Sequence, residues 1–133
     1  IHGGVLARRD LVTHMSQIEQ AGIAPIDLVV VNLYPFTAYL NTERADDPEE
    51  MTELVDVGGP TMIRAAAKNH RFVLPLIDPT DYKEVIDLLS VNSGAEDPFP
   101  LELRRRLAAK VFSNLSDYDR AIVFCGHVGP CGN

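Results

Sequence analysis

The sequence predicts an α/β fold in which a small parallel sheet is layered with helices, as in Rossmann-like proteins. Two apolar runs, residues 26–33 and 72–77, have the near-continuous, branched character of strands that are buried on both faces. Segments with helical spacing alternate with them along the chain. Two shorter candidates lie near Val5 and Val55. The expected sheet is therefore small.

The first helix is expected after the apolar residues 5–7. Asp10 fits its N-cap, and Gly22 suits a left-handed turn at its carboxyl end. Three residues would form its apolar side: Leu11, Met15 and Ile18.

Asn32 and Tyr34 stand two residues apart at the carboxyl end of the first strand, which Pro35 ends because proline cannot donate to a ladder. If the strand persists that far, both side chains project to the edge where open α/β sheets bind ligands. They either face a pocket or form an ordinary polar strand end with an interfacial tyrosine. Position alone favours neither.

Residues 37–46 are expected to form a loop, and a second helix is expected after Asp47. The order of Asp47, Pro48 and Glu50 is close to a capping box. The acidic residues here predict a capped, solvated helix start rather than a pair of catalytic carboxylates.

Residues 55–70, V-D-V-G-G-P-T-M-I-R-A-A-A-K-N-H, are typical of a short strand, a glycine turn and a helix. Gly58 and Gly59 allow a ligand to approach the backbone, and Pro60 fits the first helical position. The free N–H groups of the first turn favour negative charge. The segment therefore predicts an anion-handling site.

Along this helix, Thr61, Arg64 and Lys68 fall on one side. Such a basic stripe could hold an anionic ligand. The alternative is that Lys68 complements the helix dipole in the last turn while Asn69 takes the left-handed terminal conformation. Composition alone favours this second interpretation.

The second half of the chain predicts one strand and three helices. Pro75 inside the strand indicates an edge position or a bulge. Thr80 or Asp81 is expected to cap the next helix, and two more helices are expected at 101–112 and 116–124. Seven residues are expected to face inward: Val85, Ile86, Leu89, Leu103, Leu107, Val111 and Phe112.

Three successive arginines, Arg104 to Arg106, point to several sides of the helix expected at 101–112. Glu102 and Arg106 form a natural i, i+4 pair. The run predicts a solvated face, with phosphate binding as the alternative.

Composition excludes several classes of function. The net charge of −7 argues against a nucleic-acid partner. No apolar run approaches the roughly 18 residues of a membrane span, and no signal pattern begins the chain, so we expect a cytoplasmic protein without a membrane partner. The spacing of Cys125, His127 and Cys131 does not match a zinc site, and no metal is expected.

Five motifs occur in a specific order: I-H-G-G-V-L-A-R-R at the start, N-L-Y-P-F at 32–36, residues 55–70, D-P-T-D-Y at 78–82 and R-R-x-L-A-x-K-V-F at 104–112. With them the chain resembles the IMP cyclohydrolase domain of the bifunctional purine-biosynthesis enzymes that combine AICAR transformylase and IMP cyclohydrolase. The resemblance covers residues 1–122 as a partial domain and leaves 123–133 as an unmatched tail.

This resemblance implies a methylglyoxal-synthase-like α/β fold, here incomplete, and a purine-biosynthesis enzyme. The reaction would be the closure of 5-formamidoimidazole-4-carboxamide ribonucleotide (FAICAR) to IMP with loss of water, without cofactor or metal. The family's transformylase domain, which uses 10-formyltetrahydrofolate, has no counterpart in these residues. The resemblance also implies a homodimer for the full-length protein.

Carried over position by position, the resemblance makes Lys68 the catalytic proton donor and acceptor, with Tyr34 and Asp56 beside it. The nucleotide would be lined by Asn32, Leu33, Val57 and Gly58. These types suit the chemistry, because an oxyanion must be stabilised and protons moved before water leaves.

One departure from the family concerns the region before Ile1. The family has a K-T-L-H-P-type segment there, preceded by strands and turns that hold the phosphate. We therefore expect the chain alone to be incomplete and inactive as an enzyme, with an exposed strand edge. The alternatives are a non-catalytic, anion-binding or nucleotide-binding regulatory module of the same fold, and a fragment that folds only on a partner.

Overall fold

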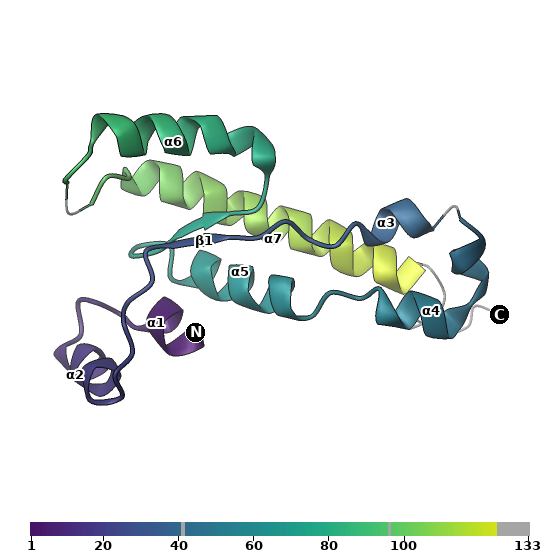
Figure 1. Ribbon diagram of the computed structural model, residues 1–133, viewed down its shortest axis with the longest axis horizontal. Coiled ribbons are helices and arrows are strands. Elements are labelled where there is room, and N and C mark those ends of the chain that lie inside the picture. Colours follow the sequence, from purple (N-terminus) through teal and green to yellow (C-terminus); the bar gives the residue numbers. More distant parts are fainter. Residues whose placement is uncertain (41, 96, 125–133) are drawn as a thin grey trace.

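A computed structural model describes residues 1–40, 42–95 and 97–124. Its centre is a parallel sheet of two strands, β1 (Leu28–Val30) and β2 (Leu74–Leu76), against which helices pack (Figure 1). Leu28 lies opposite Leu74, and Val30 lies opposite Leu76. The predicted α/β class with a small parallel sheet is confirmed.

The helices make the molecule elongated. The longest of them, α7, runs through most of its length, with α5 along one side and α6 along the other (Figure 1). In the part of the chain that the structure describes, no helix combines the length and apolar character needed to cross a membrane. The helical elements are α1 (His2–Leu6), α2 (Val12–Gln20), α3 (Phe36–Tyr39), η1 (Glu43–Asp46), α4 (Pro48–Glu53), α5 (Gly58–Lys68), η2 (Pro79–Asp81), α6 (Tyr82–Val91) and α7 (Leu101–Phe124).

Pro75 occupies the middle of β2, as an edge strand allows. The Leu74 N–H donates to the Asp27 carbonyl, and the Leu76 carbonyl accepts from the Val31 N–H. The backbone of Pro75 between them therefore points away from β1, towards a side on which the described residues place no strand. The expected edge position is confirmed.

Strand β1 is shorter than expected and is not buried on both faces. Val29 and Val31 pack towards α5, and Leu28 packs with the cluster between β2, α6 and α7. Val30 is 48% exposed because that cluster does not extend over it. The expectation of two covered faces is therefore wrong for the end of this strand.

Helix α7 replaces the two helices expected in this region. Leu107, Val111 and Leu115 are buried along one side of it and join α5, β2 and α6 in a common interior. Asn114, part of the polar segment where a break was expected, donates its side-chain amide to the Lys110 carbonyl at 2.8 Å and stays within the helix. Phe112, expected inside, is 44% exposed because it follows Val111 by one position, about 100° around the helix.

The amino-terminal segment also departs from expectation. Residues near Val5 form α1 rather than a strand, and Val5 itself is buried against α5. Asp10 does not cap α2, whose N-cap is Leu11, because its carboxylate pairs with Arg8 instead. Gly22 has a φ of 64°, which confirms the left-handed turn.

Caps and core positions elsewhere are partly as expected. Asp47 accepts hydrogen bonds from the N–H groups of Glu49 and Glu50 and caps α4 as predicted. In contrast, α3 and η1 lie where a loop was expected, and no strand forms near Val55. Asp81 is the N-cap residue of α6, as expected, although its side chain makes no capping hydrogen bond, and Asp78 caps the preceding turn η2. Two further expectations are wrong: Ile86 and Leu89 are exposed, and Glu102 pairs with Arg105.

Asn69 fastens the amino-terminal segment to α5. Its side chain is 8% exposed, and its amide donates to the carbonyls of Val5 at 2.8 Å and Ala7 at 3.1 Å. Its φ of −101° shows that it does not take the expected left-handed conformation. The side-chain hydrogen bonds of Asn69, and not its backbone conformation, therefore explain the asparagine at this position.

Replacing Asn69 with alanine should destabilise the fold by about 1–3 kcal/mol, because two buried carbonyls lose their donor. Urea unfolding followed by circular dichroism measures the change. Asn114→Ala removes an exposed hydrogen bond from a side-chain amide to a backbone carbonyl, and it should lower the free energy of unfolding by less. Equal costs for the two variants would contradict the role given to Asn69.

Candidate functional site

The carboxyl ends of β1 and β2 bring together residues that are far apart in the sequence. Asn32 follows β1, whereas Asp78, Asp81 and Tyr82 follow β2. The Tyr82 hydroxyl donates to Asn32 Oδ1 at 2.7 Å. The predicted position of Asn32 at this edge is confirmed, and its side chain is held by a residue that sequence reasoning did not assign to the site.

Tyr34 takes a different neighbour. Its ring stacks on Tyr39 with 5.8 Å between centroids and 7° between planes, and the two hydroxyls are 3.3 Å apart. The hydrogen bond with the Tyr39 hydroxyl raises the pKa of Tyr34, which keeps this half-exposed phenol protonated and able to donate. The Arg44 guanidinium lies over the outer face of this pair, 5.4 Å from the centre of the Tyr39 ring.

The carboxylate of Asp56 fills the amino-terminal end of α5. Its Oδ1 accepts from the Gly59 N–H at 2.9 Å, and its Oδ2 lies 3.5 Å from the Tyr34 N–H. The helix starts at Gly58, so Pro60 is its third residue rather than its first. The anion that this glycine turn favours is therefore the chain's own carboxylate.

The two glycines of the turn are not equivalent. A Cβ added to Gly59 would lie 2.5 Å from Asp56 Oδ2 and 3.1 Å from Val31, whereas one added to Gly58 would meet nothing within 4 Å. Val57 and Gly58 are exposed beside Asp56, and Leu33 packs into the interior below them. Among the residues expected to line a nucleotide, Asn32, Val57 and Gly58 are exposed, and Leu33 is partly buried.

Tyr118, which the sequence did not indicate, positions this turn from α7. Its hydroxyl accepts the Asp56 N–H at 2.7 Å, and its ring meets Phe36 edge-on. Burial raises the pKa of the Tyr118 phenol. A tyrosine nearly two turns from the end of a helix gives no local signal of such a contact, so it could not be found without the fold.

Lys68 lies apart from Tyr34 and Asp56. It ends α5, ten residues after Gly58, which corresponds to roughly 15 Å along the helix axis. Of the three residues expected to act together, the structure brings only Tyr34 and Asp56 into contact.

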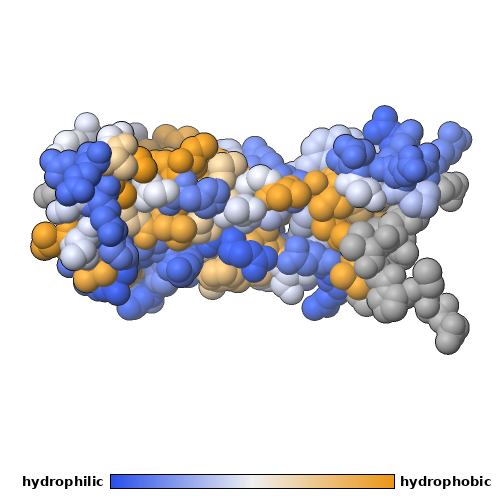
Figure 2. Space-filling model, turned by 90° about the horizontal axis from the view of Figure 1, so that it is seen from below, coloured by the Kyte–Doolittle hydropathy of each residue, from blue (hydrophilic) through white to orange (hydrophobic). Residues whose placement is uncertain are grey.

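A groove of about 490 Å³ surrounds the exposed side chain of Lys68. It is lined by the predicted stripe of Thr61, Arg64 and Lys68, by His2 of α1, and by apolar neighbours that include Phe112. Arg64 pairs with Asp119 at 3.2 Å, but Lys68 has no ion pair within the described ranges. The view from below shows apolar patches interrupted by hydrophilic residues on the side where α1 and α5 lie (Figure 2).

A second charged cluster supports the turn after β2. Lys110 Nζ lies 2.6 Å from both Asp78 Oδ2 and Asp81 Oδ2. The hydrogen bond from Lys110 is the main cause that lowers the pKa of Asp78 to about 2, and the two carboxylates raise the pKa of Lys110. Lys110 and both aspartates lie in motifs that carry the family resemblance, which was the signal available in the sequence.

The described residues do not gather a metal site. Among them, no group of three or more His, Cys, Asp or Glu side chains could hold an ion. Cys125, His127 and Cys131 lie outside the described residues. The donors at the carboxyl edge, which are backbone N–H groups, phenols and an amide, suit a polar organic ligand.

Comparison with known proteins identifies relatives over most of the chain. The sequence model of a family described as AICARFT/IMPCHase bienzyme matches residues 66–125. The bifunctional purine biosynthesis protein PurH of Lactiplantibacillus plantarum is 49% identical over 122 residues, which cover 92% of this chain and 23% of that protein. PurH of Streptococcus mutans is 49% identical over 97% of this chain and 24% of its own length. The chain thus spans about a quarter of these relatives.

A solved structure shares the architecture. The crystal structure of ForH matches with a TM-score of 0.80 and 40% sequence identity, over 93% of this chain and 62% of that one. The arrangement of helices and parallel strands fits the methylglyoxal-synthase-like fold implied by the sequence motifs.

Replacing Gly59 with alanine should destabilise the fold by about 1–3 kcal/mol, because the added methyl group collides with the Asp56 carboxylate and Val31. Gly58→Ala is the matched control, and we expect it to be neutral or stabilising by up to about 1 kcal/mol. Urea unfolding of both variants measures the difference. Equal destabilisation would contradict the packing described for Asp56.

The Asp78–Lys110 pair predicts a pH dependence. Because the pKa of Asp78 is lowered from 3.8 to about 2, the pair contributes fully to stability above pH 4 and loses this contribution as the pH falls towards 2. Carbon-13 NMR of the Asp78 carboxyl should give a midpoint near 2. In Lys110→Met the midpoint should return towards 3.8, and in the control Lys83→Met, which breaks the Lys83–Asp87 pair, it should not move.

Proposed function

Because this chain belongs to the AICARFT/IMPCHase family, we propose that it carries out the cyclohydrolase half of that chemistry, the closure of FAICAR to IMP. The observation that carries this proposal is the identity of about one half with PurH proteins over 92% or more of the chain. The names of these relatives describe bifunctional purine biosynthesis. A small-molecule nucleotide is thus the proposed substrate.

In the proposed reaction the carboxamide nitrogen of FAICAR attacks the formyl carbon. A new C–N bond forms, and the formyl oxygen takes up protons and leaves as water. The substrate already holds every atom of the product, so ring closure needs no group donor, and we propose that it proceeds without cofactor or metal. The protein has to position the two groups, stabilise the developing oxyanion and move protons.

We assign proton transfer to Lys68, whose amine is exposed in a groove and has no ion-pair partner among the described side chains. Tyr34 lies with Asp56 at the opposite end of α5 from Lys68, so it would donate a hydrogen bond to another part of the bound nucleotide. Asp56 would orient the turn at Val57 and Gly58 against the nucleotide, because its carboxylate already accepts the Gly59 N–H. Asn32 and Leu33 would complete the lining.

The proposal extends to the setting of the reaction. We propose a homodimer for the whole protein, a cytoplasmic location, and no nucleic-acid or membrane partner. Transfer of a formyl group from 10-formyltetrahydrofolate belongs, in this proposal, to the whole bifunctional enzyme rather than to these 133 residues.

Lys68→Ala tests the assignment directly. A complete cyclohydrolase domain that contains these residues is mixed with FAICAR, and the formation of IMP is followed by its absorbance. We expect the rate to fall at least 100-fold, since general acid–base groups contribute about 10²–10⁴-fold. Arg120→Ala, which removes the other lysine or arginine without an ion pair in the described part of the chain, is the matched control and should leave the rate unchanged.

Two outcomes count against the proposal. Unchanged turnover in Lys68→Ala would remove the role given to this residue. Binding of FAICAR or IMP by calorimetry without any turnover in the unmodified complete domain would instead favour a regulatory module of the same fold.

A further inference from the structure

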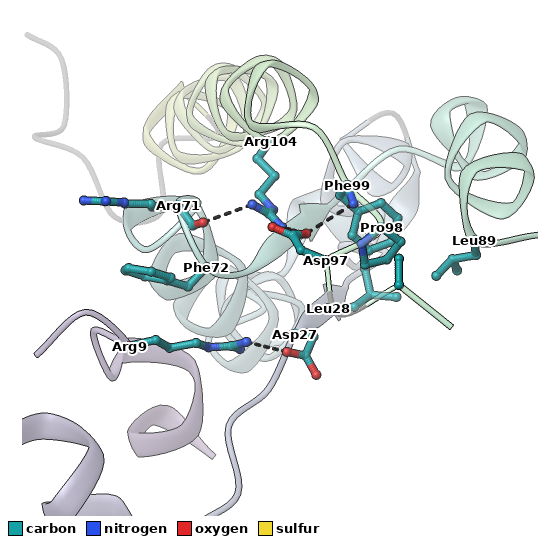
Figure 3. A pocket seen from close by; sticks show the side chains of 11 residues that line it. Arg9, Asp27, Leu28, Arg71, Phe72, Leu89, Asp97, Pro98, Phe99 and Arg104 are labelled. Carbon is teal, nitrogen blue, oxygen red and sulfur yellow. Dashed lines mark hydrogen bonds and ion pairs between the residues drawn. The ribbon is translucent and has the colours of Figure 1, made fainter. Parts of the chain in front are cut away.

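A second hollow lies at the opposite end of the sheet, where β1 and β2 begin (Figure 3). Its volume is about 480 Å³, within the range of small-molecule sites. Three arginines from separate segments line it: Arg9 after α1, Arg71 before β2, and Arg104 in the first turn of α7. Three cations around one hollow stand out in a chain whose net charge is −7.

Arg104 is the most deeply placed of the three. It is only 6% exposed, so it does not belong to the solvated face expected for the arginine run. One terminal nitrogen donates to the Arg71 carbonyl at 3.0 Å, and the other pairs with the Asp97 carboxylate. Its Nε is buried without any hydrogen-bond partner. A buried, charged donor is thus left unsatisfied.

The Asp97 carboxylate is an exchangeable partner for Arg104. Its side chain is more than half exposed and precedes α7 on a connecting segment. It bonds one terminal nitrogen of Arg104 and leaves Nε unused. An oxyanion in its place could accept from Nε and a terminal nitrogen together, the two-bond geometry that a guanidinium prefers.

The charges around the hollow indicate that the ligand is an anion. Among the described residues that line it, two carboxylates, Asp27 and Asp97, face the three arginines. Arg9 is bound to Asp27 at 2.6 Å and to the Ile26 carbonyl. Arg71 is bound to Asp10 at 3.4 Å. If Asp97 is displaced, Arg104 is therefore the arginine that loses its carboxylate partner, and an anion would take the place of that carboxylate.

The remaining wall is apolar. Phe72, Leu28 and Pro98 border the hollow next to the arginines (Figure 3). Inorganic phosphate would fill the charged part and leave this wall uncovered. A phosphate monoester with a flat organic group matches both parts, because its phosphate is anionic near neutral pH and its ring can lie against Phe72.

We propose that this hollow, the arginine pocket formed by Arg9, Arg71 and Arg104, binds a phosphate monoester at the amino end of the sheet by displacing the Asp97 carboxylate. The site is separate from the carboxyl edge and from the groove around Lys68. It does not depend on the cyclohydrolase function proposed above.

NMR of the arginine side chains tests the proposal, with inorganic phosphate, adenosine monophosphate and adenosine as probes. The monophosphate should shift the Arg104 Nε–H signal saturably and bind more tightly than inorganic phosphate, and adenosine should not shift it. Arg71→Gln should weaken the binding at least tenfold. Asp97→Asn should strengthen it, because the competing carboxylate is gone.

Arg105→Gln is the matched control, since Arg105 is an exposed neighbour on α7 that pairs with Glu102 outside the pocket. It should leave the affinity unchanged. Absence of a saturable shift at Arg104, or equal weakening by Arg71→Gln and Arg105→Gln, would overturn the site. Binding that is lost in Lys68→Ala but kept in Arg71→Gln would place the anion in the groove around Lys68 instead.

Discussion

The fold depends on one apolar seam along α7. Leu103, Leu107, Val111, Leu115 and Tyr118 follow each other at intervals of three or four residues and are all buried. The first two pack with β2 and α6, the next two with α5 and the end of β1, and Tyr118 with α3 and α4. A sheet of two short strands has little surface with which to unite these elements. Helix α7 therefore joins the surrounding elements into one core, as a wider sheet does in larger α/β proteins. The carboxyl ends of the strands and the turn at Asp56 keep their relative positions because both pack against α7.

The parts of the fold that the sequence predicts are those whose signals are local. Asp47 and Gly22 act through their own backbone or that of the next few residues, and Pro75 restricts only its own strand. The features that the sequence could not predict depend on contacts between distant segments. The segment around Gly4 forms a helix and packs with its backbone against the distant Ala24 carbonyl, so close that a Cβ on Gly4 would stand 2.4 Å from the carbonyl oxygen. The continuity of α7 likewise rests on Leu115, whose burial by α5 no local pattern records.

The candidate site likewise combines features with local sequence signals and features that depend on distant contacts. The glycine turn correctly indicated a place where negative charge is favoured, but no local rule says that Asp56 supplies that charge. Since its carboxylate is engaged with the Gly59 N–H and is near the Tyr34 N–H, its first effect is to shape the turn. Lys68 differs because its amine is free to meet a ligand. Residue types and motifs indicate candidate side chains, whereas the length of α5 decides which of these candidates lie at the same end of that helix.

The bond between Tyr118 and Asp56 joins residues 62 positions apart and has a consequence for synthesis. Chains emerge from the ribosome amino end first, so the turn, both strands and α5 are made before the residues that pack them together. Until α7 is complete, Phe36 and Met51 lack the aromatic partner that covers them, and the interior between α5 and β2 stays open. These elements therefore cannot pack as they do in the structure until α7 has been made, and a nascent chain stalled before α7 leaves the apolar surface of Phe36 and Met51 without this cover.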